Sequence, residues 1–182
     1  AHAPTVSPSA MAACQDSVVA TNLVFEQSFP AGPPAVLAMF RDPAYVERKG
    51  ERSGSHDITV TVEERPDGGA TVISKRTMPA NLPSFAKSLV GDTLTVTETQ
   101  QWGPPGVDGS CDATVTVEFS APIKYTGSIS LTPSGDGSTA RTDGEFKASV
   151  PFVGGKVEKL ACEQTEKYLG VEERVGREWL GG

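Results

Sequence analysis

The chain of 182 residues carries 16 lysines and arginines against 23 aspartates and glutamates, a formal net charge of −7. Because this surplus of negative charge repels the phosphate backbone and no basic cluster reverses it, the sequence argues against nucleic acid as a partner. Hydrophobic residues make up 37% of the chain, alongside 19 glycines and 14 prolines. No apolar run approaches the roughly 20 residues of a membrane-spanning helix, so we expect a turn-rich protein that does not span a membrane.

The chain length and the first residues set the expected domain organisation. The first ten residues show no periodicity, and we interpret residues 1–16 as a disordered leader or an extension left by cloning. Residues 17–182 are long enough for a single domain with one hydrophobic core. We expect this domain to be cytoplasmic, with export as the alternative if residues 1–10 are the remnant of a processed leader.

Three cysteines, Cys14, Cys111 and Cys162, lie far apart in the sequence. They form no C-x-x-C pair, so their pattern supports neither a metal site nor a disulfide framework and favours a reducing compartment. The spacing still permits one bridge between two of them. Cys162 lies beside apolar helix positions and is more simply explained as a small buried side chain.

The first third of the chain predicts a strand followed by two short helices. Residues 17–29 are rich in β-branched and aromatic side chains, which is typical of a strand. The GPP sequence at 32–34 provides the first turn of one helix, and Asp42-Pro43 can cap and begin a second.

Six further strands are predicted from the middle of the chain. Residues 56–78 alternate apolar and polar side chains around the turn sequence PDGG, which indicates a hairpin. The stretch 79–91 contains two prolines and is expected to form a connection that can include a short helix. Turn sequences then separate four more strands, at 92–102, 110–119, 123–133 and 138–150.

The last predicted element is a long amphipathic helix that begins at Gly154 or Gly155 and ends near Leu180. Apolar or small side chains recur at steps of three and four, and we expect the Lys and Glu residues between them to form a solvated face. Two glycines before a helix can also mark a phosphate-binding turn. The P-loop pattern, however, requires Gly and Ser or Thr where this chain has Val150 and Val157.

Three segments carry a resemblance to a known family: FEQSFPAGPPAVLAMFRDPAYVERK, RTMPANLPSFAKSLVGDTLTVTETQQW and GEFKASVPFVGGKVEKL. They look like the actinobacterial family of unknown function DUF2505, and the order of elements over about residues 23–180 resembles the START, or Bet v 1-like (SRPBCC), superfamily. The resemblance implies an α+β helix-grip fold, with a curved, seven-stranded antiparallel sheet wrapped around the long C-terminal helix. In such a fold we expect Gly154-Gly155 to permit a sharp turn into the helix.

The resemblance also implies an interior cavity, which in the superfamily holds lipids, sterols, polyketides or other apolar molecules. The alternative is a filled core, because alternating Val and Ile facing a helix also make a packed interior. The candidate ligand-binding residues are Val60, Val62, Arg76, Phe85, Val96, Glu98, Trp102, Val117, Phe119, Tyr125, Leu160 and Tyr168.

Polar groups inside the cavity would distinguish binding from catalysis. Glu98 shares strand parity with Val96, and Arg76 has the matching parity on the preceding strand. An inward Glu98–Arg76 pair could anchor a ligand carboxylate or hydroxyl, whereas a one-residue shift of register would turn both side chains outward. His56 follows a polar loop, so we expect it to be exposed rather than catalytic.

The sequence offers no Ser–His–Asp triad, metal site or cofactor site, so no catalytic residue, metal or cofactor is expected. Tyr125 and Tyr168 can each present a hydroxyl to a ligand. The prediction is a protein that binds or transports a hydrophobic, lipid-like small molecule in an interior cavity. Two alternatives stay open: an enzyme resembling polyketide cyclases and aromatases, in which side chains orient the ligand and transfer protons, and a closed-cavity protein-interaction module with an exposed apolar patch.

Overall fold

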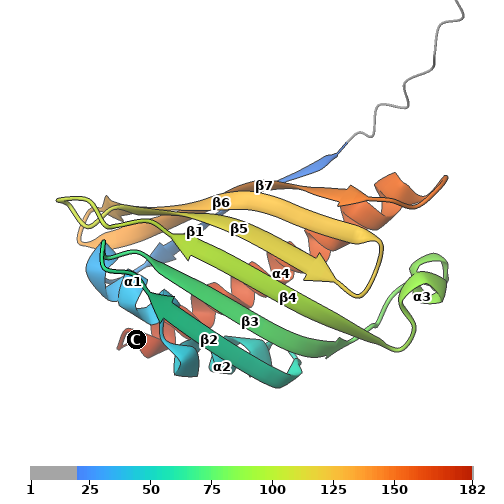
Figure 1. Cartoon of the computed structure of the whole chain (residues 1–182), viewed down its shortest axis with the longest axis horizontal. Coiled ribbons are helices and arrows are strands. Elements are labelled where there is room, and N and C mark those ends of the chain that lie inside the picture. Colours follow the sequence, from blue (N-terminus) through green and yellow to red (C-terminus); the bar gives the residue numbers. More distant parts are fainter. Residues whose placement is uncertain (1–19, 182) are drawn as a thin grey trace, which may run out of the picture.

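The computed structural model describes residues 20–181, so the predicted leader at 1–16 lies outside the described residues. Within this part of the chain, seven antiparallel strands form one sheet in the order β1-β7-β6-β5-β4-β3-β2 (Figure 1). The strands are β1 (Thr21–Phe29), β2 (His56–Glu64), β3 (Ala70–Pro79), β4 (Thr93–Trp102), β5 (Cys111–Phe119), β6 (Ile123–Ser134) and β7 (Gly137–Ala148). The helices are α1 (Pro33–Phe40), α2 (Pro43–Arg52), α3 (Ser84–Val90) and α4 (Gly154–Trp179). The predicted α+β helix-grip architecture is confirmed.

Helices α1 and α2 carry the chain from one edge of the sheet to the other. β1 lies at one edge and β2 at the opposite edge (Figure 1). Each helix begins with proline, whose fixed φ suits the first turn. Proline also lacks the backbone N–H, which would have no partner within the helix at this position. The Asp42 side chain accepts a hydrogen bond of 2.9 Å from the backbone N–H of Ala44. The predicted cap at Asp42 is therefore confirmed.

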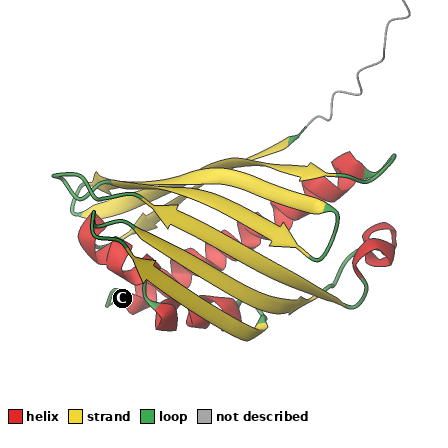
Figure 2. Cartoon of the chain, viewed as in Figure 1, coloured by secondary structure: helices red, strands yellow, loops and turns green. Residues whose placement is uncertain are grey.

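The long helix α4 runs along one side of the sheet from end to end (Figure 2). It packs mainly against β1, β7 and α2 rather than against the strands in the middle of the sheet. Neither α4 nor any other helix within residues 20–181 combines the length and apolarity needed to cross a bilayer. The inner face of the middle strands is therefore not covered directly by α4.

Near its beginning, α4 is fixed to the sheet by the buried side chain of Glu158. The carboxylate of Glu158 accepts hydrogen bonds from Thr21 Oγ1 at 2.9 Å and from the backbone N–H of Ala148 at 2.8 Å. These partners belong to β1 and β7, so one side chain ties the helix to two neighbouring strands. The prediction that the charged residues of α4 form a solvated face is wrong for Glu158 and for Glu172, which is also buried.

Aromatic side chains from α1 and the strands beside it pack together at one end of the hydrophobic core. Phe40 stacks on Trp102 with 5.8 Å between ring centroids and meets Phe29 edge to face at 5.6 Å. Cys111 and Cys162 are buried and free, as expected for Cys162, whereas Cys14 lies outside the described residues. The end of the sheet at which β4 finishes is thus closed by packed rings.

The turn from β7 into α4 does not use its two glycines in the predicted way. Gly154 and Gly155 lie in the first turn of the helix without a positive φ, and a Cβ at Gly155 would meet nothing within 4 Å. The left-handed conformation falls on Phe152, at φ 67°, whose side chain is exposed. The expected architectural role of the glycine pair is therefore wrong.

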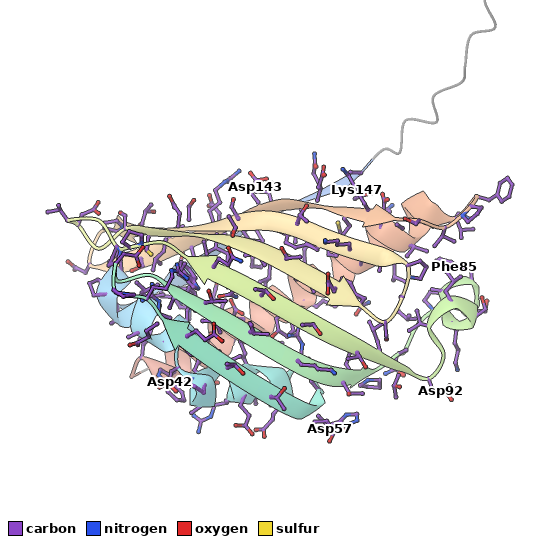
Figure 3. The ribbon with its side chains drawn as sticks, in the orientation of Figure 1. Asp42, Asp57, Phe85, Asp92, Asp143 and Lys147 are labelled. Atoms are coloured by element: carbon purple, nitrogen blue, oxygen red, sulfur yellow. The ribbon has the colours of Figure 1, made fainter. Side chains whose placement is uncertain are left out.

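The connection between β3 and β4 forms the short helix α3, which ends at Gly91 with φ 80°, a conformation that favours glycine. Figure 3 shows Phe85 on this helix, at the end of the molecule opposite the C-terminus marked in Figure 1. The beginning of α4 lies at the same end (Figure 1). The closed aromatic end and the α3 end are thus opposite ends of the sheet.

Two glycines within α4 should respond oppositely to the same substitution. A Cβ at Gly176 would lie 2.6 Å from Phe29 Cε1, whereas a Cβ at Gly170 would meet nothing within 4 Å. We expect Gly176→Ala to lower the free energy of unfolding by about 1–3 kcal/mol through overpacking. Gly170→Ala should raise it by up to about 1 kcal/mol through helix propensity. Urea denaturation of both variants measures this, and a Gly176→Ala variant as stable as wild type would contradict the close approach of α4 to β1.

Candidate ligand cavity

A cavity of about 320 Å³ lies between α4 and the facing strands of the sheet. Its wall is mainly apolar and includes Val96, Val117, Phe119, Ile129, Phe146 and Leu160. Four lining residues are also exposed and mark the mouth: Pro79, Asn81, Pro122 and Gln164. Since α3 contributes Ala86 and Leu89 to the wall, the cavity opens at the α3 end of the molecule.

Polar side chains gather at the inner end of the cavity, away from this mouth. Glu98 and Gln100 line the cavity from the half of β4 that leads to the closed aromatic end. On α4, Glu172 lies about 22 Å along the helix from Val157, at a rise of about 1.5 Å per residue. The apolar part of a ligand would thus lie between the mouth and a polar inner end.

The first polar contact is a buried ion pair between α2 and α4. Lys49 Nζ binds a carboxylate oxygen of Glu172, and these side chains are only 4% and 7% exposed. The other oxygen of Glu172 accepts a hydrogen bond of 3.1 Å from Gln27 Nε2 of β1. The Tyr45 hydroxyl donates a bond of 3.0 Å to the backbone carbonyl of Glu172. One short segment of α4 is therefore held by α2 and β1 together.

The second ion pair joins β3 and β4 inside the cavity. Arg76 Nη1 lies 3.4 Å from Glu98 Oε2. The other oxygen of Glu98 accepts a hydrogen bond of 2.6 Å from Gln100 Nε2, and the side-chain oxygen Oε1 of Gln100 accepts one of 2.9 Å from Trp102 Nε1. The inward orientation of Arg76 and Glu98 is therefore the one that the structure adopts. Alternate residues of β4 form a hydrogen-bonded row on its inner face.

Tyr168 of α4 lies between the two ion pairs. The guanidinium carbon of Arg76 is 4.5 Å from the centroid of its ring, and Lys49 Nζ is 5.8 Å away. Both distances are within the range of cation–π attraction. The ring of Tyr168 thus connects the pair on the sheet to the pair between the helices.

The two ion pairs favour the ionised forms of Glu98, Lys49 and Arg76. Burial acts to raise the pKa of Glu98, but the cations of Lys49 and Arg76 lower it overall. Burial acts to lower the pKa of Lys49, but the carboxylate of Glu172 raises it overall. Burial likewise acts to lower the pKa of Arg76, but Tyr168 and Glu98 raise it overall. For Tyr168, burial raises the pKa in spite of both cations, so the phenol stays neutral.

Tyr125 lies on the cavity wall with a buried hydroxyl that has no hydrogen-bond partner within residues 20–181. Burial raises the pKa of this hydroxyl to about 12. The side chain lies against Gly127 and Gly144, where a Cβ would come closer than 3.0 Å to the Tyr125 hydroxyl. The glycine pair on β6 and β7 thus makes room for the tyrosine beside the cavity.

The structure brings most of the predicted site residues together. Eight of the twelve line the cavity: Arg76, Val96, Glu98, Val117, Phe119, Tyr125, Leu160 and Tyr168. The other four lie elsewhere: Val60 and Val62 are on the edge strand β2 beside α2, Phe85 is exposed on α3, and Trp102 is packed beneath Phe40. His56 is exposed, as expected. Binding by any of the twelve stays a prediction.

Three residues of the polar inner end are missing from the sequence-based candidates, namely Gln27, Lys49 and Glu172. A signal exists for the two charged residues, because each lies on the buried stripe of its helix. Lys49 follows the buried Tyr45 by four residues, and Glu172 follows the buried Leu169 by three. A charged side chain on an apolar stripe is the pattern that predicts a buried ion pair.

The fold is the helix-grip fold of START-like, or Bet v 1-like, proteins. One solved structure with this fold is a START superfamily protein from Mycobacterium smegmatis, 15% identical, with a TM-score of 0.57 and coverage of 87% of this chain and 98% of that chain. Another is the Zhui aromatase/cyclase from a Streptomyces species, 10% identical, with a TM-score of 0.58 and coverage of 87% and 92%. These similarities concern the fold.

Within this class, the chain belongs to the family DUF2505, described as a protein of unknown function, whose match covers residues 25–180. The predicted family is thereby confirmed. An uncharacterised protein of Mycobacterium tuberculosis is 27% identical over 127 residues, which cover 68% of this chain and 72% of that protein.

The lowered pKa of Glu98 predicts how stability changes with pH. The contribution of the Glu98 carboxylate to the free energy of unfolding is fully present above its unfolded-state pKa of about 4.3. This contribution is lost as the pH falls through the lower folded-state pKa. We expect Glu98→Gln to lower the free energy of unfolding by about 3 kcal/mol at neutral pH, because Arg76 is left buried without its partner. The fall in melting temperature between about pH 5 and pH 3 should then be shallower than in wild type.

The exposed Glu118, paired with Lys124 at 4.0 Å, provides the matched control for this experiment. Glu118→Gln removes the same charge and should leave both the melting temperature and its pH dependence near those of wild type. If Glu98→Gln behaves like Glu118→Gln, the buried pair does not contribute to stability.

Proposed function

We propose that this protein binds or transports an apolar, lipid-like small molecule in the cavity between α4 and the sheet. The observation that supports this most directly is a cavity of about 320 Å³ with an apolar wall and a polar inner end. Small-molecule sites have volumes of about 300–1,000 Å³ and combine apolar walls with a few polar groups. The cavity also argues against the closed interaction module, which requires a filled interior.

An enzyme of the cyclase or aromatase type is the second candidate, because several polar side chains converge at the inner end. Acid–base catalysis is most effective when a group has a pKa near the working pH. Among the shifted groups lining the cavity, the pKa of Glu98 is lowered, whereas those of Arg76, Tyr125 and Tyr168 are raised. Each shift leads away from neutrality, so these groups support binding better than proton transfer.

Native mass spectrometry of the purified protein, followed by solvent extraction, tests for a bound apolar molecule. A homologous series of alcohols then tests the cavity itself. Each methylene buried contributes about 0.8 kcal/mol, so affinity should rise with chain length until the cavity is full. An empty protein that binds no member of the series would overturn the proposed function.

A cavity-filling variant locates the binding site. Ala161 lines the cavity from α4, whereas Glu166 is exposed on the same helix and does not line it. We expect Ala161→Phe to weaken binding of the longer alcohols at least about tenfold, and Glu166→Phe to leave it unchanged. Calorimetric titration measures the affinities, and melting temperatures verify that both variants fold. Equal weakening by the two variants would mean that the ligand binds outside the cavity.

A further inference from the structure

The charges around the inner end of the cavity balance. Lys49 pairs with Glu172, and Arg76 pairs with Glu98, so two cations are matched by two carboxylates. The four side chains are between 4% and 13% exposed, so water does little to screen them. The phenols that adjoin them, including Tyr168, are neutral. A ligand that reaches this end therefore meets ionised groups but no net charge.

Tyr168 is the neutral member of this cluster that is free to bind a ligand. Its ring is positioned by Arg76, and the residue lines the cavity. Within residues 20–181 no protein group hydrogen-bonds to its hydroxyl, which, unlike the Tyr125 hydroxyl, is not fully buried. A phenol can both donate and accept a hydrogen bond. The Tyr168 hydroxyl therefore offers a ligand one neutral polar contact.

We propose that the ligand carries an uncharged oxygen, as in a ketone, an ester or an alcohol, and that this oxygen binds the Tyr168 hydroxyl. This inference rests on the proposed function and narrows its ligand class. A carboxylate would bring a charge that nothing here balances, because the charges of Lys49 and Arg76 are already matched by those of Glu172 and Glu98. Arg76 Nε, which has no hydrogen-bond partner within residues 20–181, could still donate a hydrogen bond to a neutral oxygen. Burying an unpaired charge costs far more than burying a hydrogen-bonded neutral oxygen.

Four ligands of equal chain length separate charge from hydrogen bonding: decanone, decanol, decanoate and decane. Binding to the wild-type protein is measured by calorimetry at about pH 8, where the carboxylic acid is ionised. We expect decanone and decanol to bind at least about tenfold more tightly than decanoate. Decane should bind less tightly than decanone and decanol, because it makes no hydrogen bond.

Tyr168→Phe removes the hydroxyl and keeps the ring that Arg76 stacks on. We expect decanone and decanol to lose about fivefold to tenfold in affinity, and decane to bind as it does to wild type. The melting temperature should stay near that of wild type, because the hydroxyl forms no hydrogen bond with a protein group in the described part of the chain. A structural defect would instead weaken all the ligands and lower the melting temperature.

Glu98→Gln tests the charge balance by removing one of the two negative charges, which should favour an anionic ligand. The substitution keeps the shape of the side chain but frees the positive charge of Arg76, so the affinity for decanoate should rise about tenfold or more. Glu118→Gln makes the same chemical change on the exposed side of the neighbouring strand and should leave the affinity unchanged. If Glu98→Gln does not fold, the wild-type ligand comparison and Tyr168→Phe remain decisive.

The outcomes separate this inference from the function on which it rests. Decanoate binding to wild type as tightly as decanone, or unchanged decanone binding by Tyr168→Phe, overturns the inference and leaves the proposed function in place. If none of the four ligands binds the wild-type protein, the proposed function itself fails and the inference fails with it.

Discussion

One helix cannot cover a sheet of seven strands. With strands about 4.8 Å apart, the sheet is about 29 Å across, whereas a helix with its side chains is about 10–12 Å wide. In this protein α4 packs against β1, β7 and α2, and the aromatic cluster under α1 closes one end. The space over the remaining middle strands is the cavity of about 320 Å³. The cavity therefore follows from the difference in width between the seven-stranded sheet and the single helix α4.

The same geometry explains why ionised groups lie inside the molecule. Removing a charge from water is costly, and a buried ion pair often stabilises no better than apolar side chains of the same volume. The Lys49–Glu172 and Arg76–Glu98 pairs offset this cost with further hydrogen bonds, including the one from Gln27. Polar groups that are retained at such a cost beside a cavity are typical of functional sites. Stability alone does not account for the inner end of the cavity.

Local periodicity predicts most of the strands and helices because their patterns are properties of neighbouring residues, whereas the helix-grip arrangement is implied by the family resemblance. Strand parity gives Arg76 and Glu98 the same faces as their apolar neighbours, but it leaves open a shift of register that would turn them outward, and only the structure decides between the two. It does not predict that Lys49 and Glu172 pair, because their helices are distant in sequence and meet only through packing. The turn before α4 is mispredicted for a related reason: glycine permits a left-handed conformation without requiring it, and here Phe152 adopts it.

The pairing register between β3 and β4 sets the positions of Arg76 and Glu98 at the polar inner end of the cavity. Arg76 is directly opposite Val96, so its pair with Glu98 is a diagonal one across the two strands. A slip of β4 by one residue relative to β3 would turn Glu98 to the outer face and leave Arg76 without its partner. The hydrogen bonds from Trp102 to Gln100 and from Gln100 to Glu98 oppose such a slip, because the Trp102 ring is packed under α1. The packed aromatic end therefore positions the carboxylate that balances the charge of Arg76 at the inner end of the cavity.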